Sequence, residues 1–158
     1  MKDNMKIGIV IYSHTGHTLS VATELKDKLS ASGHAATLEQ VEPVEKVSPS
    51  ATRAELKTAP TVAPYDALVL GCPVWGGRMS APMTSYLEQI DSLQGKQVVC
   101  LVTHFFRRAW GAKQTIESMT EICESKGATV RGSGSVKWLS LNRKRQISQA
   151  VDELSGLF

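Results

Sequence analysis

Apolar and polar residues follow two alternating patterns along this chain. Short, nearly continuous apolar runs predict five strands, at 6–12, 35–41, 67–72, 97–103 and 129–138. Between and after these runs, apolar residues recur every three or four positions, which predicts helices over 17–31, 82–91, 112–125 and 142–155. The segment 42–64 holds four of the six prolines, so we expect a long connection there with at most one helical turn, around residues 54–57.

The alternation of strands and helices favours an α/β fold built from right-handed strand–helix–strand crossovers. Such crossovers give a parallel sheet with helices on both of its faces. The last strand-like run is interrupted by Gly132 and Gly134, so we expect it at an edge of the sheet. In parallel sheets ligands bind at the carboxyl ends of the strands, where the strand order changes direction. The loops after the first, third and fourth strands are therefore the expected functional loops.

Length and composition add limits to this prediction. The chain has 158 residues and a net charge of +3, which suits a single domain over 1–158 that binds no nucleic acid. No apolar run reaches the roughly 18 residues of a membrane span, and the first residues do not resemble a signal peptide, so the cytoplasm is the expected location. The three cysteines are too widely spaced for a zinc site, and no metal is expected. The basic cluster at 143–145 favours a solvated helix face.

The loop after the first strand is unusually rich in hydrogen-bond donors. Hydroxyl, imidazole and glycine residues fill six consecutive positions: Ser13, His14, Thr15, Gly16, His17 and Thr18. At the start of the following helix, backbone N–H groups and the helix dipole form an anion site, and Gly16 allows the backbone to approach the anion. No Walker lysine is present, which favours a phosphate monoester held without a metal over a nucleoside triphosphate with magnesium. A plain helix cap is the alternative.

This loop and two later segments resemble the flavodoxin family. SHTGHT is similar to that family's [ST]-x-T-G-x-T loop, which surrounds the phosphate of flavin mononucleotide (FMN). YDALVLGCPVWGGRMSAP, which begins at Tyr65, resembles the third strand and the first ring loop. VCLVTHFFRRAWGAKQT, which begins at Val99, resembles the fourth strand and the second ring loop. The resemblance implies a three-layer α/β/α flavodoxin-like fold with a five-stranded parallel sheet in the order 2-1-3-4-5, and FMN as cofactor.

The resemblance also implies which residues flank the flavin ring. On one side it places Pro73, Val74, Trp75, Gly76 and Gly77, and on the other side Thr103, His104, Phe105, Phe106, Trp110 and Gly111. The aromatic residues offer stacking area. The glycine pair allows a peptide to rotate beside the ring, and Gly111 lets the second loop approach it. Alternatively, Trp75 and Trp110 close the end of the sheet as core aromatics. His104 is a candidate proton relay.

Electron transfer through bound FMN is the expected function, with no catalytic side chain. Classical flavodoxins are strongly acidic, whereas this chain is slightly basic and carries Arg78, Arg107 and Arg108 in or beside the ring loops. These arginines favour an anionic partner or substrate, such as a nicotinamide dinucleotide or an acidic quinone. An NAD(P)H-dependent quinone reductase is therefore the alternative to a carrier that serves a redox partner protein. A remoter alternative is a cysteine-dependent phosphatase, because Cys72 and Arg78 have the CxxxxxR spacing of that class. Against it, Pro73 removes one N–H from the cradle.

Overall fold

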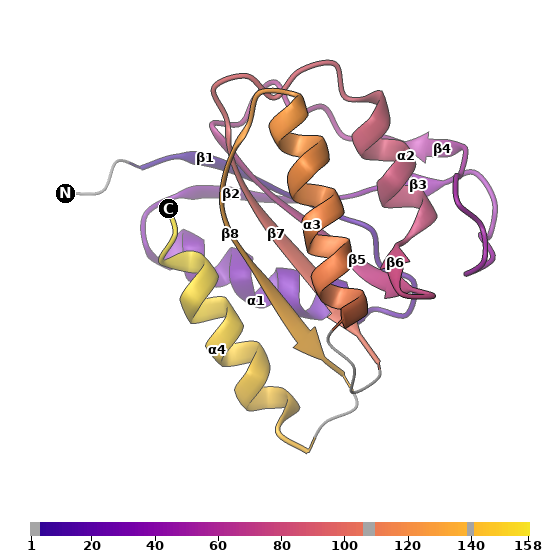
Figure 1. Cartoon of the computed structure of the whole chain (residues 1–158). Helices are drawn as coiled ribbons and strands as arrows, with labels where there is room; N and C mark the ends of the chain where they lie inside the picture. The colour runs from indigo at the N-terminus through magenta and orange to yellow at the C-terminus, as the bar shows by residue number, and fades with distance from the viewer. Residues whose placement is uncertain (1–3, 106–109, 139–140) are drawn as a thin grey trace.

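The computed structural model describes residues 4–105, 110–138 and 141–158, and strands and helices alternate through these residues (Figure 1). The strands are β1 (Lys6–Ile11), β2 (Ala35–Gln40), β3 (Glu42–Pro43), β4 (Leu56–Thr58), β5 (Ala67–Trp75), β6 (Arg78–Met79), β7 (Gln97–His104) and β8 (Thr129–Lys137). The helices are α1 (His17–Ala31), α2 (Ala81–Gln89), α3 (Trp110–Ser125) and α4 (Arg143–Ser155). Every predicted strand and helix is present, with ends that differ by a few residues at most.

The central sheet has the predicted strand order. Among the described residues, five parallel strands follow the order β2-β1-β5-β7-β8, and β6 pairs antiparallel with the end of β5. When the five predicted strands are numbered along the chain, this order is 2-1-3-4-5. β8 lies at an edge, where its glycines allow a helix to pack closely. A Cβ at Gly132 would lie 2.7 Å from Leu157 Cδ1, and one at Gly134 would lie 3.2 Å from Leu154 Cδ1.

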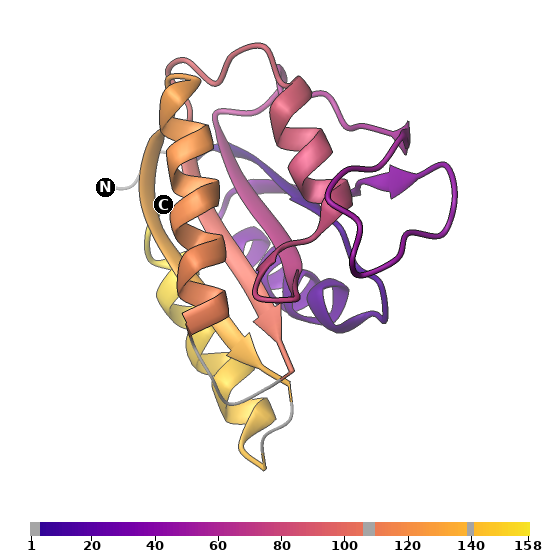
Figure 2. The ribbon, with the colours of Figure 1, turned by 45° about the vertical axis from the view of Figure 1, so that its right-hand side comes forward.

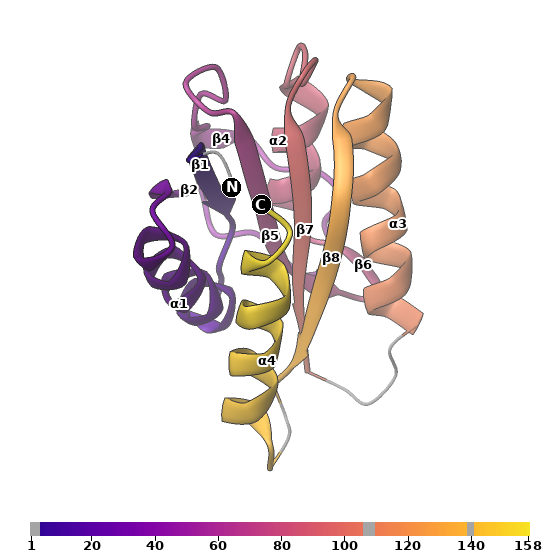
Figure 3. The same ribbon diagram turned by 90° about the vertical axis from the view of Figure 1, so that its left-hand side faces the viewer.

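Helices cover both faces of the sheet, α1 and α4 on one face and α2 and α3 on the other (Figure 3). β5 shows why the strands are continuously apolar: Leu68 and Leu70 face the core on the α2/α3 side, whereas Val69 faces the core on the α1/α4 side. Cys100 and Cys123 are fully buried in the α2/α3 core, as expected for small core residues. None of the described helices is long and apolar enough to cross a membrane.

The connection, expected to hold at most one helical turn around residues 54–57, has a short strand there and no helical turn. Leu56–Thr58 form β4, which pairs antiparallel with β3. Leu56 packs against the α2/α3 core, and pairing with β3 gives the backbone partners that one isolated helical turn lacks. The connection that holds these strands lies beside α2 (Figure 2), and Arg53 forms an ion pair with Glu88 of that helix.

Candidate functional site

A cleft opens at the carboxyl ends of β1, β5 and β7. The cleft has a volume of about 180 Å³, which is smaller than most small-molecule sites, at about 300–1,000 Å³. It is lined by Ser13, His14, Thr15, His17, Thr18, Pro73, Val74, Trp75, Thr103, His104 and Phe105. Each of these residues is among those predicted from the sequence, so the fold brings the three predicted loops together.

The first turn of α1 presents unpaired backbone donors to this cleft. Gly16 precedes the helix with φ +91°, a left-handed conformation that favours glycine. Ser13 Oγ accepts a hydrogen bond from the N–H of Leu19 at 3.3 Å. The side chain of Ser13 therefore caps this one N–H group of the first turn. The N–H groups of residues 15–18 form no hydrogen bond with any residue that the structure describes. Free N–H groups at the positive end of a helix dipole are the kind of donors that suit an anion.

Thr18 and Thr103 join the first and third of these loops. Their side chains are buried, and their hydroxyl oxygens lie 2.8 Å apart in a hydrogen bond. The sequence predicts Thr18 as a free donor to phosphate, but this bond uses one of the two hydroxyl protons of the pair. The other proton remains available to a further acceptor. Because the bond connects α1 to the end of β7, it fixes the two sides of the cleft relative to each other.

Trp75 ends β5 and forms one wall of the cleft. Val74 and Trp75 pair with β6 through a two-residue turn in which Gly76 has φ +56° and Gly77 has φ +77°. Positive φ at both central residues is the pattern of a type I′ hairpin turn. Trp75 is half-buried and reaches the cleft, so it is not a fully enclosed core aromatic. Gly76 and Gly77 do not line the cleft; they form the turn that positions Trp75.

Two rings support Trp75 from within the first loop. Tyr12, the residue after β1, lies edge-on to the indole at 5.5 Å between centroids and 89° between planes. His14 makes a similar contact at 5.6 Å and 87°. Edge-on aromatic contacts of this kind are favourable, so the first loop sets the orientation of the Trp75 ring. Tyr12 is not among the predicted site residues, although its place directly after β1 is a signal for it.

The second ring loop is described only in part. Thr103, His104 and Phe105 line the cleft, and Phe105 is 45% exposed at its mouth. Phe106 and the side chain of Trp110 lie outside the described residues, as do Arg107 and Arg108. Gly111 does not line the cleft but packs against the hairpin that carries Trp75. A Cβ at this position would lie 3.1 Å from Gly77 Cα and 3.4 Å from Val74 Cγ1, so its lack of a side chain allows α3 to approach the hairpin.

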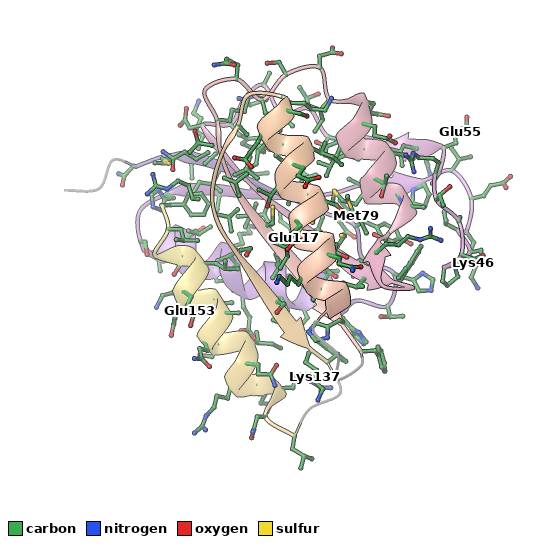
Figure 4. All side chains as sticks on the ribbon, viewed as in Figure 1. Lys46, Glu55, Met79, Glu117, Lys137 and Glu153 are labelled. Carbon is green, nitrogen blue, oxygen red and sulfur yellow. The ribbon has the colours of Figure 1, made fainter. Side chains whose placement is uncertain are left out.

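Trp138 and Arg143 lie beside the cleft without being among the predicted site residues. The Trp138 ring stacks on His17, with 4.1 Å between centroids and 15° between planes, and the Arg143 guanidinium lies 4.8 Å from the centroid of the same ring. Burial and the charge of Arg143 lower the pKa of His17. Figure 4 places Lys137 at the carboxyl end of β8, just before Trp138. The rule that ligands bind at the carboxyl ends of strands applies to β8 too, and is the signal that points to Trp138.

The structure argues against the phosphatase alternative. Cys72 lies within β5 and is fully buried, not at the base of a loop. Burial raises the pKa of its thiol to about 11, so the nucleophilic thiolate is scarce near neutral pH. Arg78 is exposed, and its guanidinium donates a hydrogen bond to the carbonyl of Ser50. The two residues are therefore not arranged around a common phosphate.

Comparison with known proteins agrees with this geometry. The family model of NADPH-dependent FMN reductase matches residues 5–138. The chain is 36% identical over 100 residues to an NAD(P)H dehydrogenase (quinone) from Trichlorobacter lovleyi, an alignment that covers 56% of this chain and only 49% of that relative. It is 28% identical over 133 residues to a flavodoxin from Megasphaera elsdenii, covering 82% of this chain and 85% of the flavodoxin.

A solved structure supports the same fold. The crystal structure of a flavoprotein in complex with FMN from Lactobacillus acidophilus has a TM-score of 0.65 and 18% sequence identity. The match covers 92% of this chain and 98% of that protein. At this identity the likeness establishes the flavodoxin-like fold, in agreement with the observed strand order.

Proposed function

The chain belongs to the family of NADPH-dependent FMN reductases, and we propose that it binds FMN in the cleft and transfers electrons through the bound flavin. We further propose that its 158 residues act as one flavodoxin-like domain. FMN, when bound, supplies the redox chemistry, while the protein binds it, orients it and tunes its potential. The observation that carries the proposal is a cleft with free anion donors at one end and an aromatic wall at the other.

The phosphate end of the cleft is the first turn of α1. The unpaired N–H groups of residues 15–18 match the acceptor oxygens of a phosphate, and the helix dipole favours its negative charge. Ser13 accepts one N–H through its oxygen and keeps its own hydroxyl proton for donation. These are neutral donors without a metal ligand set, and among the described residues no group of acidic, histidine or cysteine side chains could hold a metal ion. Such a site suits a phosphate monoester such as that of FMN.

The ring end of the cleft is the space between Trp75 and the residues that follow β7. Trp75 offers an indole face held by Tyr12 and His14, and Phe105 lines the same cleft and is partly exposed. A flavin is a flat π-system that gains stacking energy from such neighbours. His104 lines the same space and is the proposed proton relay.

Two electron sources remain as candidates. The family match and the quinone dehydrogenase relative support NAD(P)H as a direct hydride donor, which would make the protein a reductase. The flavodoxin relative supports a carrier that receives electrons from a partner protein. The slightly basic chain, with Arg78 exposed beside the cleft, favours an anionic donor such as a nicotinamide dinucleotide.

A fluorescence titration tests FMN binding. Free FMN is titrated with the apoprotein, and riboflavin, which has the same ring without the phosphate, is the matched control ligand. Strong quenching of FMN with much weaker quenching of riboflavin is expected, because the α1 donors bind only the phosphate. Absence of quenching with both ligands contradicts the proposed function. Equal affinity for both contradicts the assignment of the α1 end to the phosphate.

The electron source is tested on the protein loaded with FMN. NADPH and NADH are mixed with it without oxygen, and the loss of visible flavin absorbance is followed. Rapid bleaching that saturates with NADPH or NADH identifies a reductase. Bleaching no faster than that of free FMN, together with reduction by a flavodoxin reductase, identifies a carrier.

A further inference from the structure

His17 occupies an unusual position for a histidine on a helix surface. It is the first residue of α1, so it lies at the donor-rich end of the cleft that it helps to line. Its imidazole stacks on Trp138 at 4.1 Å and contacts Phe105 at 5.5 Å. Two aromatic neighbours from two other segments therefore hold the ring. A surface histidine with no role needs no such support.

Among the residues that the structure describes, the charged group that acts on this imidazole is the cation Arg143. On its own loop His14 lines the same cleft, and His104 of β7 lines it from the other side. Arg143 at the start of α4 acts on His17 through its charge, and Lys137 ends β8 beside Trp138. The cause of the lowered pKa of His17 is burial first and Arg143 second, and no carboxylate contributes to it. Without a bound anion, this environment favours the neutral form of the imidazole.

We propose that His17 is a proton-linked ligand of the flavin phosphate, which takes up a proton from solvent when FMN binds, and that Trp138 is the positioning residue that holds it there. This inference rests on the proposed function and adds a residue-specific charge to a site otherwise made of neutral donors. A bound phosphate brings a negative charge close to the imidazole, so it favours the imidazolium. The stack on Trp138 tolerates the charged ring, because a cation over an indole face is also favourable.

The sign of the pH dependence follows from this linkage. Binding raises the pKa of His17 from a value below its ordinary 6.5. The extra affinity is therefore complete at pH values below the pKa of the free site, and it disappears as pH rises through the pKa of the complex. Each unit of the pKa rise contributes about a tenfold gain in affinity at acidic pH. The second ionisation of the phosphate itself, near pH 6, acts in the opposite direction and must be separated from it.

The experiment compares variants across pH. FMN is titrated with the wild-type apoprotein and with His17→Gln from about pH 5 to about pH 9. The ratio of their dissociation constants cancels the ionisation of the phosphate, which both proteins experience. We expect this ratio to show about a tenfold advantage for the wild type at the acidic end and none at the alkaline end. His14→Gln, which removes another histidine from the same loop, is the matched control. Like the wild type, it is expected to bind FMN more tightly than His17→Gln at acidic pH and not at alkaline pH.

Two further measurements do not depend on the folding of His17→Gln. Calorimetric titration of the wild type with FMN, in buffers of different ionisation enthalpy, is expected to show net uptake of protons above pH 6.5 that riboflavin does not cause. Trp138→Leu is expected to reduce the pH-dependent affinity change, whereas Trp138→Phe, which keeps an aromatic face, restores it.

The outcomes separate this inference from the proposed function. If neither FMN nor riboflavin binds, the proposed function fails and the inference fails with it. If FMN binds in preference to riboflavin but the ratio of wild type to His17→Gln does not change with pH, the FMN site stands and His17 is only a structural residue. Two other results also overturn the assignment to His17. One is that His14→Gln, and not His17→Gln, loses the pH-dependent affinity for FMN. The other is that riboflavin causes the same proton uptake as FMN.

Discussion

The buried hydroxyl pair of Thr18 and Thr103 gives the sharpest test of how the cleft is held together. Valine has the shape of threonine with a methyl group in place of the hydroxyl, so Thr18→Val and Thr103→Val each remove one partner of the 2.8 Å hydrogen bond. In either single variant the remaining hydroxyl is buried, since both side chains are almost fully shielded from solvent. The double variant leaves no unsatisfied hydroxyl in the pair.

The magnitudes follow from this asymmetry. A buried polar group left without its partner costs about 1–3 kcal/mol, whereas replacing both partners by apolar groups of the same shape is nearly neutral. We therefore expect each single variant to lower the free energy of unfolding by about 1–3 kcal/mol and the double variant by about 0–1 kcal/mol. The two losses are strongly non-additive, as expected for residues in direct contact.

Urea unfolding of the four apoproteins, followed by circular dichroism, measures these differences. The wild type, the two single variants and the double variant form a complete double-mutant cycle. Equal slopes in urea are the control that the unfolded states are comparable. If the double variant loses the sum of the two single losses, the hydroxyls are not a coupled buried pair, and the link between α1 and β7 proposed from them is wrong.

Three other predictions concern the wall of the cleft and the buried thiols. Trp75→Leu is expected to raise the dissociation constants of FMN and riboflavin by a similar factor, about 2- to 10-fold, because it removes stacking on the ring and leaves the phosphate site intact; fluorescence titration checks this, and a selective loss of FMN affinity would contradict it. Gly76→Val is expected to cost about 1–2 kcal/mol in urea unfolding, because φ at this position is +56°, whereas Gly76→Asn costs much less, since asparagine tolerates this conformation in type I′ turns. Burial raises the pKa of Cys72 to about 11 and of Cys123 to about 12 from the ordinary 9.0. These thiols ionise first in the unfolded chain, so the free energy of unfolding falls as pH rises above 9.0; native thiols that react with iodoacetamide near neutral pH would argue against this burial.

The fold could be predicted from the sequence because its elements are encoded locally. The apolar runs of β1, β5 and β7 are buried on both faces, so their pattern is strong, and the helical stripe of α1 has one clear inner side. β4 could not be predicted, because it depends on a contact between segments that are distant in the sequence. It has three residues, and it exists because the chain returns to pair with β3, a contact that no local period records.

The same distinction between local pattern and long-range contact applies to the site. The loops that follow β1, β5 and β7 could be predicted because a parallel sheet brings the carboxyl ends of its strands to one edge. The Thr18–Thr103 bond and the contact of Gly111 with the hairpin could not, because they depend on side chains from distant segments meeting at atomic distances. Trp138 belongs to the same group, since it follows the last strand of the chain and contacts His17, which begins the first helix.

These long-range contacts explain how the two ends of the cleft act as one site. The phosphate end depends on α1, and α1 is bonded to the end of β7 through Thr18. The ring end depends on the hairpin of Trp75, and that hairpin is packed against α3 at Gly111 and contacted by Tyr12 from the first loop. The described walls of the cleft are therefore joined to each other by direct contacts, which limit the ordering that those walls need when a ligand binds. That arrangement favours an elongated ligand with a flat ring at one end and an anion at the other, which is the shape and charge of FMN.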